Sequence, residues 1–147
     1  MIQEQAWNGY QQMRVRLGER ISRELARETG LSEADFEILS ALIESDDESV
    51  RSIALRCGLQ WEKSRLSHQL RRMEQRGLVS REACLEDNRG SMVRITPLGR
   101  ELAHKAKAVH ERTLQRYLFD ALNENQLRAL DEIAGTVLAG LGEPVHS

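Results

Sequence analysis

Residues 52–79 read SIALRCGLQWEKSRLSHQLRRMEQRGLV, and this stretch decides how the rest of the chain is interpreted. Ser52 can cap a short helix over 53–57 that ends at Gly58. A longer helix is expected over 60–76, because apolar residues recur there at steps of three and four. The stretch therefore predicts two helices joined by a tight turn.

The longer helix has one apolar side and one cationic side. At about 100° per residue, Leu66, Leu70 and Met73 fall within a narrow arc that must pack on the domain. The opposite side is rich in the donors that base edges and phosphates require in a DNA major groove. An ordinary solvated helix face has a similar composition, so this side alone leaves both interpretations open. Its members are Trp61, Ser64, Arg65, His68, Arg71, Arg72 and Gln75.

A β-hairpin is expected directly after this helix. Residues 78–84 and 92–96 are β-compatible and flank the polar stretch LEDNRGS, which contains a turn-forming Asn and Gly. A thin ribbon can enter a minor groove about 6 Å wide, where the guanidinium of Arg89 meets concentrated negative potential. Asp87 can hold Arg89 in an extended rotamer. A polar turn with an incidental ion pair is the alternative explanation.

Positive charge is concentrated in the middle of the chain. The 147 residues carry a formal net charge of -2, which taken whole argues against a nucleic-acid partner. Residues 51–94, however, hold 10 basic and 5 acidic side chains, whereas 1–50 hold 5 and 11, and 95–147 hold 6 and 7. A positive patch on an otherwise negative chain can be directed at a polyanion.

Amphipathic helices are expected on both sides of this cationic stretch. One ends at Gly30, a capping box of Ser32 and Asp35 starts the next, a long helix opens at 96–97, and the last begins at 123–126. The chain length fits one compact domain, and no apolar run approaches the roughly 20 residues that span a bilayer. We therefore expect a cytoplasmic protein.

Three short motifs match a known family. RGLV follows the longer helix at 76–79, DNRG occupies the hairpin at 87–90, and ITPLGR follows the hairpin at 95–100. Residues 52–100 thereby resemble the winged helix-turn-helix core of MarR-type transcription regulators. The flanking helices match more weakly, in number, length and order. The resemblance implies a mainly α fold of six helices with a small β-hairpin wing.

The resemblance also implies an assembly. It makes 1–30 and 97–147 a helical dimerisation region and 31–96 a winged helix-turn-helix lobe for DNA. The first and last two helices of each subunit would intertwine in a homodimer. The apolar surface of the terminal helices supports this, because a winged helix alone cannot cover it. Two recognition helices would then read half-sites about 10 to 10.5 base pairs apart on a pseudo-palindrome.

The resemblance further assigns roles to residues. Residues 53–57 become the support helix and 62–76 the recognition helix, while Arg89 enters the minor groove with Asp87 as its acidic partner. Histidine gains a proton near neutral pH, so a DNA contact by His68 predicts tighter operator binding as pH falls from about 8 to 6. The expected DNA contacts are Lys63, Ser64, Arg65, His68, Arg72 and Arg89.

The start of the recognition helix departs from the family pattern. QWEKSR stands there in place of smaller polar residues. Trp61 either presses on a thymine methyl or sugar, or packs against the support helix, and packing is the commoner fate of Trp. Glu62 either accepts from a cytosine amine or caps its own helix, and capping is the simpler explanation.

A small aromatic acid or phenol is the effector that the resemblance implies, bound between the dimer helices and the DNA-binding lobe. Trp7, Tyr10, Met13 and Phe36, with the start of the helix after Pro97, are the residues expected to line its cavity. Apolar residues at helical spacing are more often plain core, which is the alternative. No cofactor is expected.

The alternatives to a ligand-responsive repressor are a redox or metal sensor, an enzyme and a protein-binding adaptor. Oxidation of Cys57 or Cys84 would disturb the DNA surface, yet no cluster that lowers a thiol pKa is evident in the sequence. His104 and His110 are six residues apart and do not form the i, i+4 pair that grips zinc. No HExxH, GxSxG, GxGxxG or GxxxxGK motif indicates an enzyme. A winged-helix adaptor for protein partners remains open, and salt dependence of DNA binding separates it from a regulator.

Overall fold

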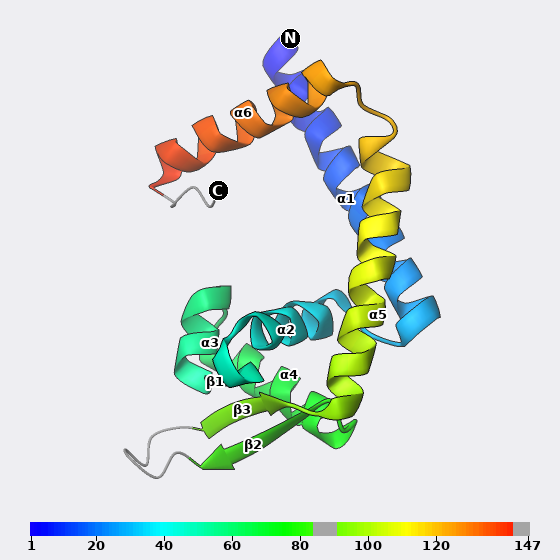
Figure 1. The fold of residues 1–147 in the computed structure, drawn as a ribbon. Coiled ribbons are helices and arrows are strands. Elements are labelled where there is room, and N and C mark those ends of the chain that lie inside the picture. The colour runs from blue at the N-terminus through cyan, green and yellow to red at the C-terminus, as the bar shows by residue number, and fades with distance from the viewer. Residues whose placement is uncertain (84–90, 143–147) are drawn as a thin grey trace.

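The computed structural model describes residues 1–83 and 91–142, and its elements are mainly helical (Figure 1). Six α-helices and a small sheet occupy this part of the chain, as the sequence predicts. The elements are α1 (Ile2–Thr29), α2 (Glu33–Glu44), η1 (Asp46–Glu48), β1 (Ser49–Arg51), α3 (Ser52–Leu59), α4 (Lys63–Gln75), β2 (Val79–Ala83), β3 (Ser91–Ile95), α5 (Pro97–Leu114), η2 (Gln115–Phe119) and α6 (Glu124–Leu141).

The sheet contains the predicted hairpin and one further strand. β2 pairs with β3 antiparallel, with Val79 opposite Ile95 and Ala83 opposite Ser91. β1 pairs with the other edge of β3, so the strand order is β1-β3-β2. The sequence did not predict β1, because three residues are too few to show the alternation that marks a strand.

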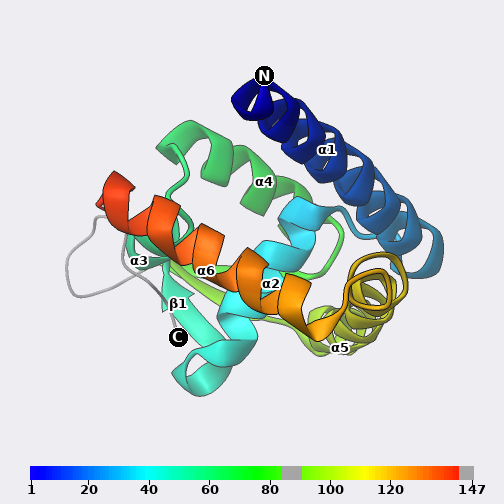
Figure 2. The same cartoon turned by 90° about the horizontal axis from the view of Figure 1, so that it is seen from above.

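α2 is the central element of the lobe. Figure 2 shows it between α4 and α5, and its Ile38, Leu39 and Leu42 are fully buried. The core continues into α4, the sheet, the end of α1 and the middle of α5. Burial of this apolar surface is the main stabilising term for the lobe. It fixes α4 relative to the sheet.

The predicted starts of α2, α5 and α6 are confirmed by their caps. Ser32 Oγ accepts from the Asp35 backbone N–H at 3.0 Å, and the Asp35 carboxylate accepts from the Ser32 N–H at 2.9 Å. This reciprocal pair is a full capping box. Thr96 Oγ1 accepts from the Gly99 N–H at 2.9 Å at the start of α5, and a second capping box starts α6 over 123–126.

The turn between α3 and α4 differs from the prediction. α3 does not end at Gly58 but continues to Leu59, and Gln60 adopts the left-handed conformation with φ 59°. Ser52 is the first residue of α3 rather than its cap, and its Oγ accepts from the Ser91 N–H at 3.4 Å. α4 begins at Lys63, not at 60. Glu62 holds the N-cap position, but its side chain makes no capping hydrogen bond, so that predicted role is wrong.

Gly99 permits a close approach between α5 and the strand region. A Cβ built at this position would lie 2.1 Å from the Leu78 carbonyl oxygen. The first turn of α5 therefore packs directly on the backbone that follows α4. This contact is the physical reason for the glycine in the ITPLGR motif.

α6 and the first half of α1 project beyond the lobe (Figure 1). α6 has no buried residue, and it leaves Ile133, Val137 and Leu141 at least half exposed. The first half of α1 also exposes large apolar side chains, including Trp7. Among the described residues, no helix combines the length and apolar character needed to span a bilayer.

Candidate nucleic-acid interface

The two sides of α4 are those that its sequence predicts. Leu66, Leu70 and Met73 are each at most 3% exposed and pack into the lobe. The expected DNA contacts of this helix are all exposed, with Lys63 at its first residue and Ser64, Arg65, His68 and Arg72 on the side away from the buried residues. The amino-acid sequence thus builds a helix with a hydrophobic underside and a donor-rich outer side, the arrangement that a major groove requires.

Trp61 packs inside the lobe, which is the more favoured of the two interpretations of this residue. It is 8% exposed and belongs to the hydrophobic core. The guanidinium carbon of Arg65 lies over the indole ring, 3.8 Å from its centroid. A side chain of the core therefore supports a cation on the outer surface of α4.

Asp35 is a buried hub that joins α2 to α4. Its carboxylate is almost completely buried, and it accepts from Gln69 Nε2 at 2.5 Å and from Arg76 Nη1 at 2.7 Å. Arg76 also donates through Nη2 to the Gly30 carbonyl at 2.9 Å. A buried charge requires such partners, because an unpaired carboxylate in the core is costly. The hub fixes the end of α4 against the α1–α2 connection.

The hub extends to one of the predicted DNA contacts. Arg72 Nη2 donates to Gln69 Oε1 at 2.8 Å, while the amide nitrogen of Gln69 donates to Asp35. Gln69 is itself 8% exposed, so its orientation is set by both bonds. The sequence did not predict Asp35 and Gln69 as supporting residues. The available signal was a polar Gln69 within the apolar side of the helix.

The two wing strands carry further arginines. Arg81 donates from Nε and Nη2 to Ser91 Oγ at 3.4 and 3.3 Å, which ties β2 to β3. Arg94 Nη1 donates to the Asp47 carbonyl at 3.2 Å. Both side chains therefore support the base of the hairpin. The predicted wing-tip residues Arg89 and Asp87 lie outside the described residues.

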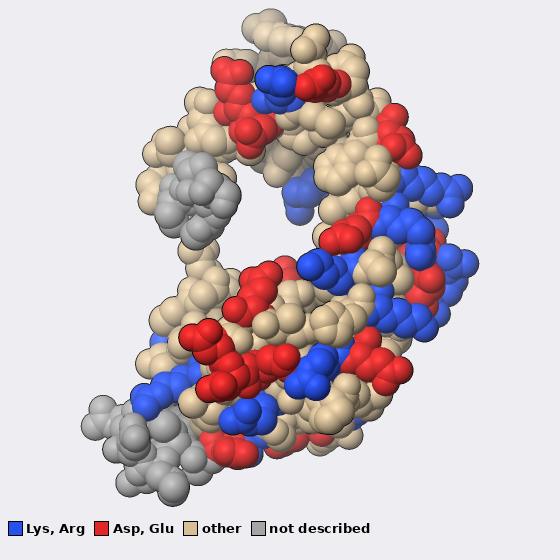
Figure 3. Space-filling view, viewed as in Figure 1, with Lys and Arg blue, Asp and Glu red and all other residues tan. Residues whose placement is uncertain are grey.

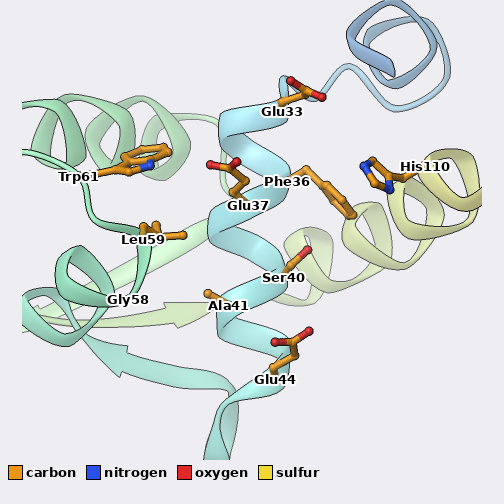
Figure 4. A pocket seen from close by; sticks show the side chains of 10 residues that line it. All are labelled: Glu33, Phe36, Glu37, Ser40, Ala41, Glu44, Gly58, Leu59, Trp61 and His110. Carbon is orange, nitrogen blue, oxygen red and sulfur yellow. The ribbon is translucent and has the colours of Figure 1, made fainter. Parts of the chain in front are cut away.

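A hollow of about 500 Å³ lies over α2, between the turn that joins α3 to α4 and helix α5. Figure 4 shows Phe36 directed towards His110 on one side of α2, with Trp61 and Leu59 on the other. Three glutamates line this hollow, and Figure 3 shows acidic side chains gathered over α2 and η1. Burial raises the pKa of the Glu33 carboxyl, the nearby Glu37 adds to the rise, and His110 opposes it.

The four residues predicted for an effector cavity are not brought together within this protomer. Phe36 lines the α2 hollow and a neighbouring one of about 240 Å³ against α5. Met13 lines a separate hollow of about 390 Å³ between α1 and η2. Trp7 and Tyr10 are exposed on α1, with their ring centroids 5.8 Å apart. The predicted cavity remains a prediction.

The cysteine and histidine positions bear on the sensor alternatives. Cys57 is exposed on α3, whereas Cys84 lies outside the described residues. His104 and His110 both lie on α5, and His110 contacts the Phe36 ring at a centroid distance of 5.1 Å. Within the described ranges, no group of three or more metal-ligating side chains is close enough to hold a metal ion.

Comparison with known proteins now identifies the fold. Residues 31–91 match the model of the MarR family. The structure of AbsC, a MarR family transcriptional regulator from Streptomyces coelicolor, superposes with a TM-score of 0.85 at 32% sequence identity, and the match covers 94% of this chain and 93% of that one. The chain belongs to the MarR family. It is therefore a MarR-family transcriptional regulator.

Two further relatives of this MarR-family chain support the family assignment. Sco3205, a MarR family transcriptional regulator from the same organism whose structure is a complex with DNA, has a TM-score of 0.86 and 30% identity, covering 96% of this chain and 91% of that chain. The HTH-type transcriptional regulator YdgJ of Bacillus subtilis is 29% identical over 106 residues, 72% of this chain. That match spans 63% of the length of YdgJ.

Proposed function

We propose that this MarR-family regulator binds a pseudo-palindromic DNA operator as a homodimer and represses transcription by occupying a promoter. The single observation that carries the proposal is the row of exposed donors on α4, held rigidly by a buried underside. The Sco3205 structure, which contains DNA, supports the choice of partner. We expect Lys63, Ser64 and His68 to contact the duplex, with Arg65 and Arg72.

A second copy of the chain is the proposed partner for the exposed apolar side chains outside the lobe. α6 buries nothing within the protomer, and Val137 and Leu141 are 55% and 69% exposed. Such a surface is unusual on a monomer and typical of an interface. We propose that residues 1–30 and 97–147 form the dimerisation region and 31–96 the DNA-binding lobe.

A small aromatic or phenolic effector is the proposed regulator of DNA binding. Trp7, Tyr10 and Met13 lie on α1, apart from Phe36 on α2, so the proposed cavity requires the second copy to close it. A ligand that binds the DNA-incompetent state 100-fold better supplies about 2.7 kcal/mol of coupling, a usual allosteric magnitude. Function in the cytoplasm, where bacterial DNA resides, completes the proposal.

Selection of DNA fragments by the purified protein tests this function. We expect enrichment of a pseudo-palindrome with half-site centres about 10 to 10.5 base pairs apart. Affinity should fall by orders of magnitude between about 50 and 200 mM salt, because several arginines contact phosphates. Arg89→Ala should weaken binding by about 1 to 3 kcal/mol if the wing tip reads the minor groove with Asp87 beside it. No preference for any duplex at low salt would refute the proposal and favour a protein-binding adaptor.

A further inference from the structure

We propose that Trp61 is a positioning residue that holds Arg65 ready to read a guanine base, and that it thereby sets part of the operator specificity. This inference rests on the proposed DNA-binding function. The sequence allowed Trp61 either to touch DNA or to pack inside. The structure points to a third role, in which the buried indole acts on DNA through the arginine stacked on it.

Trp61 is a fixed platform. It lies in the turn before α4, where its backbone N–H donates to the Arg56 carbonyl at 3.2 Å, and the side chain is only 8% exposed. Arg65 lies four residues further on, in the first turn of α4, with its guanidinium carbon 3.8 Å from the indole centroid. This distance is well within the range of a cation–π contact.

Stacking and base reading use different parts of the guanidinium. The π face rests on the indole, whereas the N–H donors leave from the edge of the group and are the atoms that bind guanine O6 and N7 as a pair. Within the described ranges, no carboxylate and no hydrogen-bond acceptor engages Arg65. Its donors are therefore available, while its rotamer is already restricted. Part of the entropy that a free arginine loses on docking is lost before DNA arrives.

Arg72, the other arginine of α4 among the expected DNA contacts, is held differently. Its Nη2 donates to Gln69 Oε1 at 2.8 Å, so part of its donor edge is already used. Of these two arginines, only Arg65 keeps all its guanidinium N–H donors without a partner among the described residues. We therefore assign the bidentate guanine contact to Arg65, near the start of α4, and expect one G·C pair in each half-site to depend on Trp61.

A matched pair of variants tests this assignment. Trp61→Leu keeps an apolar side chain but removes the π face, whereas Trp61→Phe keeps both. We expect wild type to prefer G·C at one position of each half-site, and Arg65→Ala to lose that preference. Trp61→Leu should weaken the same preference about three- to tenfold, and Trp61→Phe should largely retain it. In the Arg65→Ala background, Trp61→Leu should cause no further loss of discrimination.

The outcomes separate the two proposals. If wild type shows no sequence preference, the DNA-binding function itself fails, and this inference fails with it. If Arg65→Ala loses a guanine preference that Trp61→Leu keeps, the positioning role is overturned and the DNA-binding function stands. An equal effect of Trp61→Leu with and without Arg65 overturns the role as well, because the indole then acts by another route.

A second measurement needs neither DNA nor the folding of a Trp61 variant. The chain has two tryptophans, so Trp7→Phe leaves Trp61 as the sole fluorophore. In that background Arg65→Ala uncovers the indole, and acrylamide should quench its fluorescence measurably faster. Arg71→Ala removes an exposed arginine from the same helix and should leave quenching unchanged. Equal quenching with and without Arg65 would mean that the stack is not populated, and would overturn the proposal.

Discussion

The winged lobe buries its apolar residues, whereas α6, here called the arm, leaves its apolar residues exposed. In the lobe Leu39, Leu42 and Met73 are fully buried within one protomer. In α6 no residue is buried, although its sequence has an equally regular apolar pattern, with Val137 and Leu141 exposed. The lobe is thus stabilised by its own core, whereas the arm has the composition of a core with nothing in the protomer to cover it. Changes in the arm should affect assembly, and changes in the lobe should affect folding.

The largest effect should come from charging the arm. Val137→Glu with Leu141→Glu places two carboxylates in the proposed interface, so we expect loss of self-association by sedimentation. Loss of the second half-site contact should reduce operator affinity by about 100-fold or more. The exposed polar substitution Asp131→Gln on the same helix is the control and should change neither property. A charged double variant that stays dimeric would contradict the contrast between the two regions.

Adding one methyl group at Gly99 should destabilise the lobe, because α5 packs there directly on the Leu78 backbone. Gly99→Ala places a Cβ 2.1 Å from the Leu78 carbonyl, a backbone atom that can retreat only if α5 shifts. We expect the free energy of unfolding to fall by about 3 kcal/mol. Gly58→Ala is the matched control, because a Cβ there meets no atom within 4 Å. It should be neutral or stabilising by up to about 1 kcal/mol in denaturant titration, and an equal loss in both variants would refute the packing argument.

The Asp35 hub should give the next effect. Asp35→Ala removes the carboxylate half of the capping box, the partner of Gln69 and the ion pair to half-exposed Arg76 together. We expect a loss of about 2 to 4 kcal/mol in the free energy of unfolding. Ser32→Ala removes only the cap and should cost about 1 kcal/mol. If both variants cost the same, the links from Asp35 to α4 contribute nothing to stability.

The smallest effect concerns the pH dependence of folding at the α2 hollow. Burial raises the pKa of Glu33 above its ordinary value of 4.5. At pH values between 4.5 and this raised pKa, the folded state therefore binds more protons than the unfolded state. The free energy of unfolding should therefore fall as pH rises from about 4.5 through the raised pKa. Glu33→Gln should remove this part of the profile. Because Glu33 is only partly buried, the difference between the two urea-unfolding profiles should be small, and identical profiles would refute the shift.

Most of the features that the sequence predicted correctly come from short-range patterns, namely residue spacing within a helix and neighbouring capping residues. The spacing of Leu66, Leu70 and Met73 fixed the buried side of α4, and neighbouring residues specified the capping boxes. The Asp35 hub could not be predicted in this way, because its partners lie 34 and 41 residues away along the chain. The left-handed Gln60 was missed for a different reason. Gly58 is the better residue for that conformation, yet α3 continues through it to Leu59.

Of the candidate site, the sequence predicted the exposed residues but not their supports. Ser64, Arg65, His68 and Arg72 share one side of α4 because helical periodicity places them there, whereas Lys63 is exposed as the first residue of the helix. The order imposed on Arg65 by Trp61, and on Arg72 by Gln69, depends on tertiary packing. The wing-tip contact by Arg89 stays a prediction.

The hydrogen bond from Arg76 to the Gly30 carbonyl makes α1 a lever. α1 has 28 residues and is about 42 Å long at about 1.5 Å per residue. A displacement of about 4 Å at its far end corresponds to a rotation of about 5° about this joint. Since Arg76 directly follows α4, the same rotation would reach the helix that we propose faces the duplex. In the proposed dimer, small sliding movements between the two copies would thereby change the angle at which α4 enters the groove.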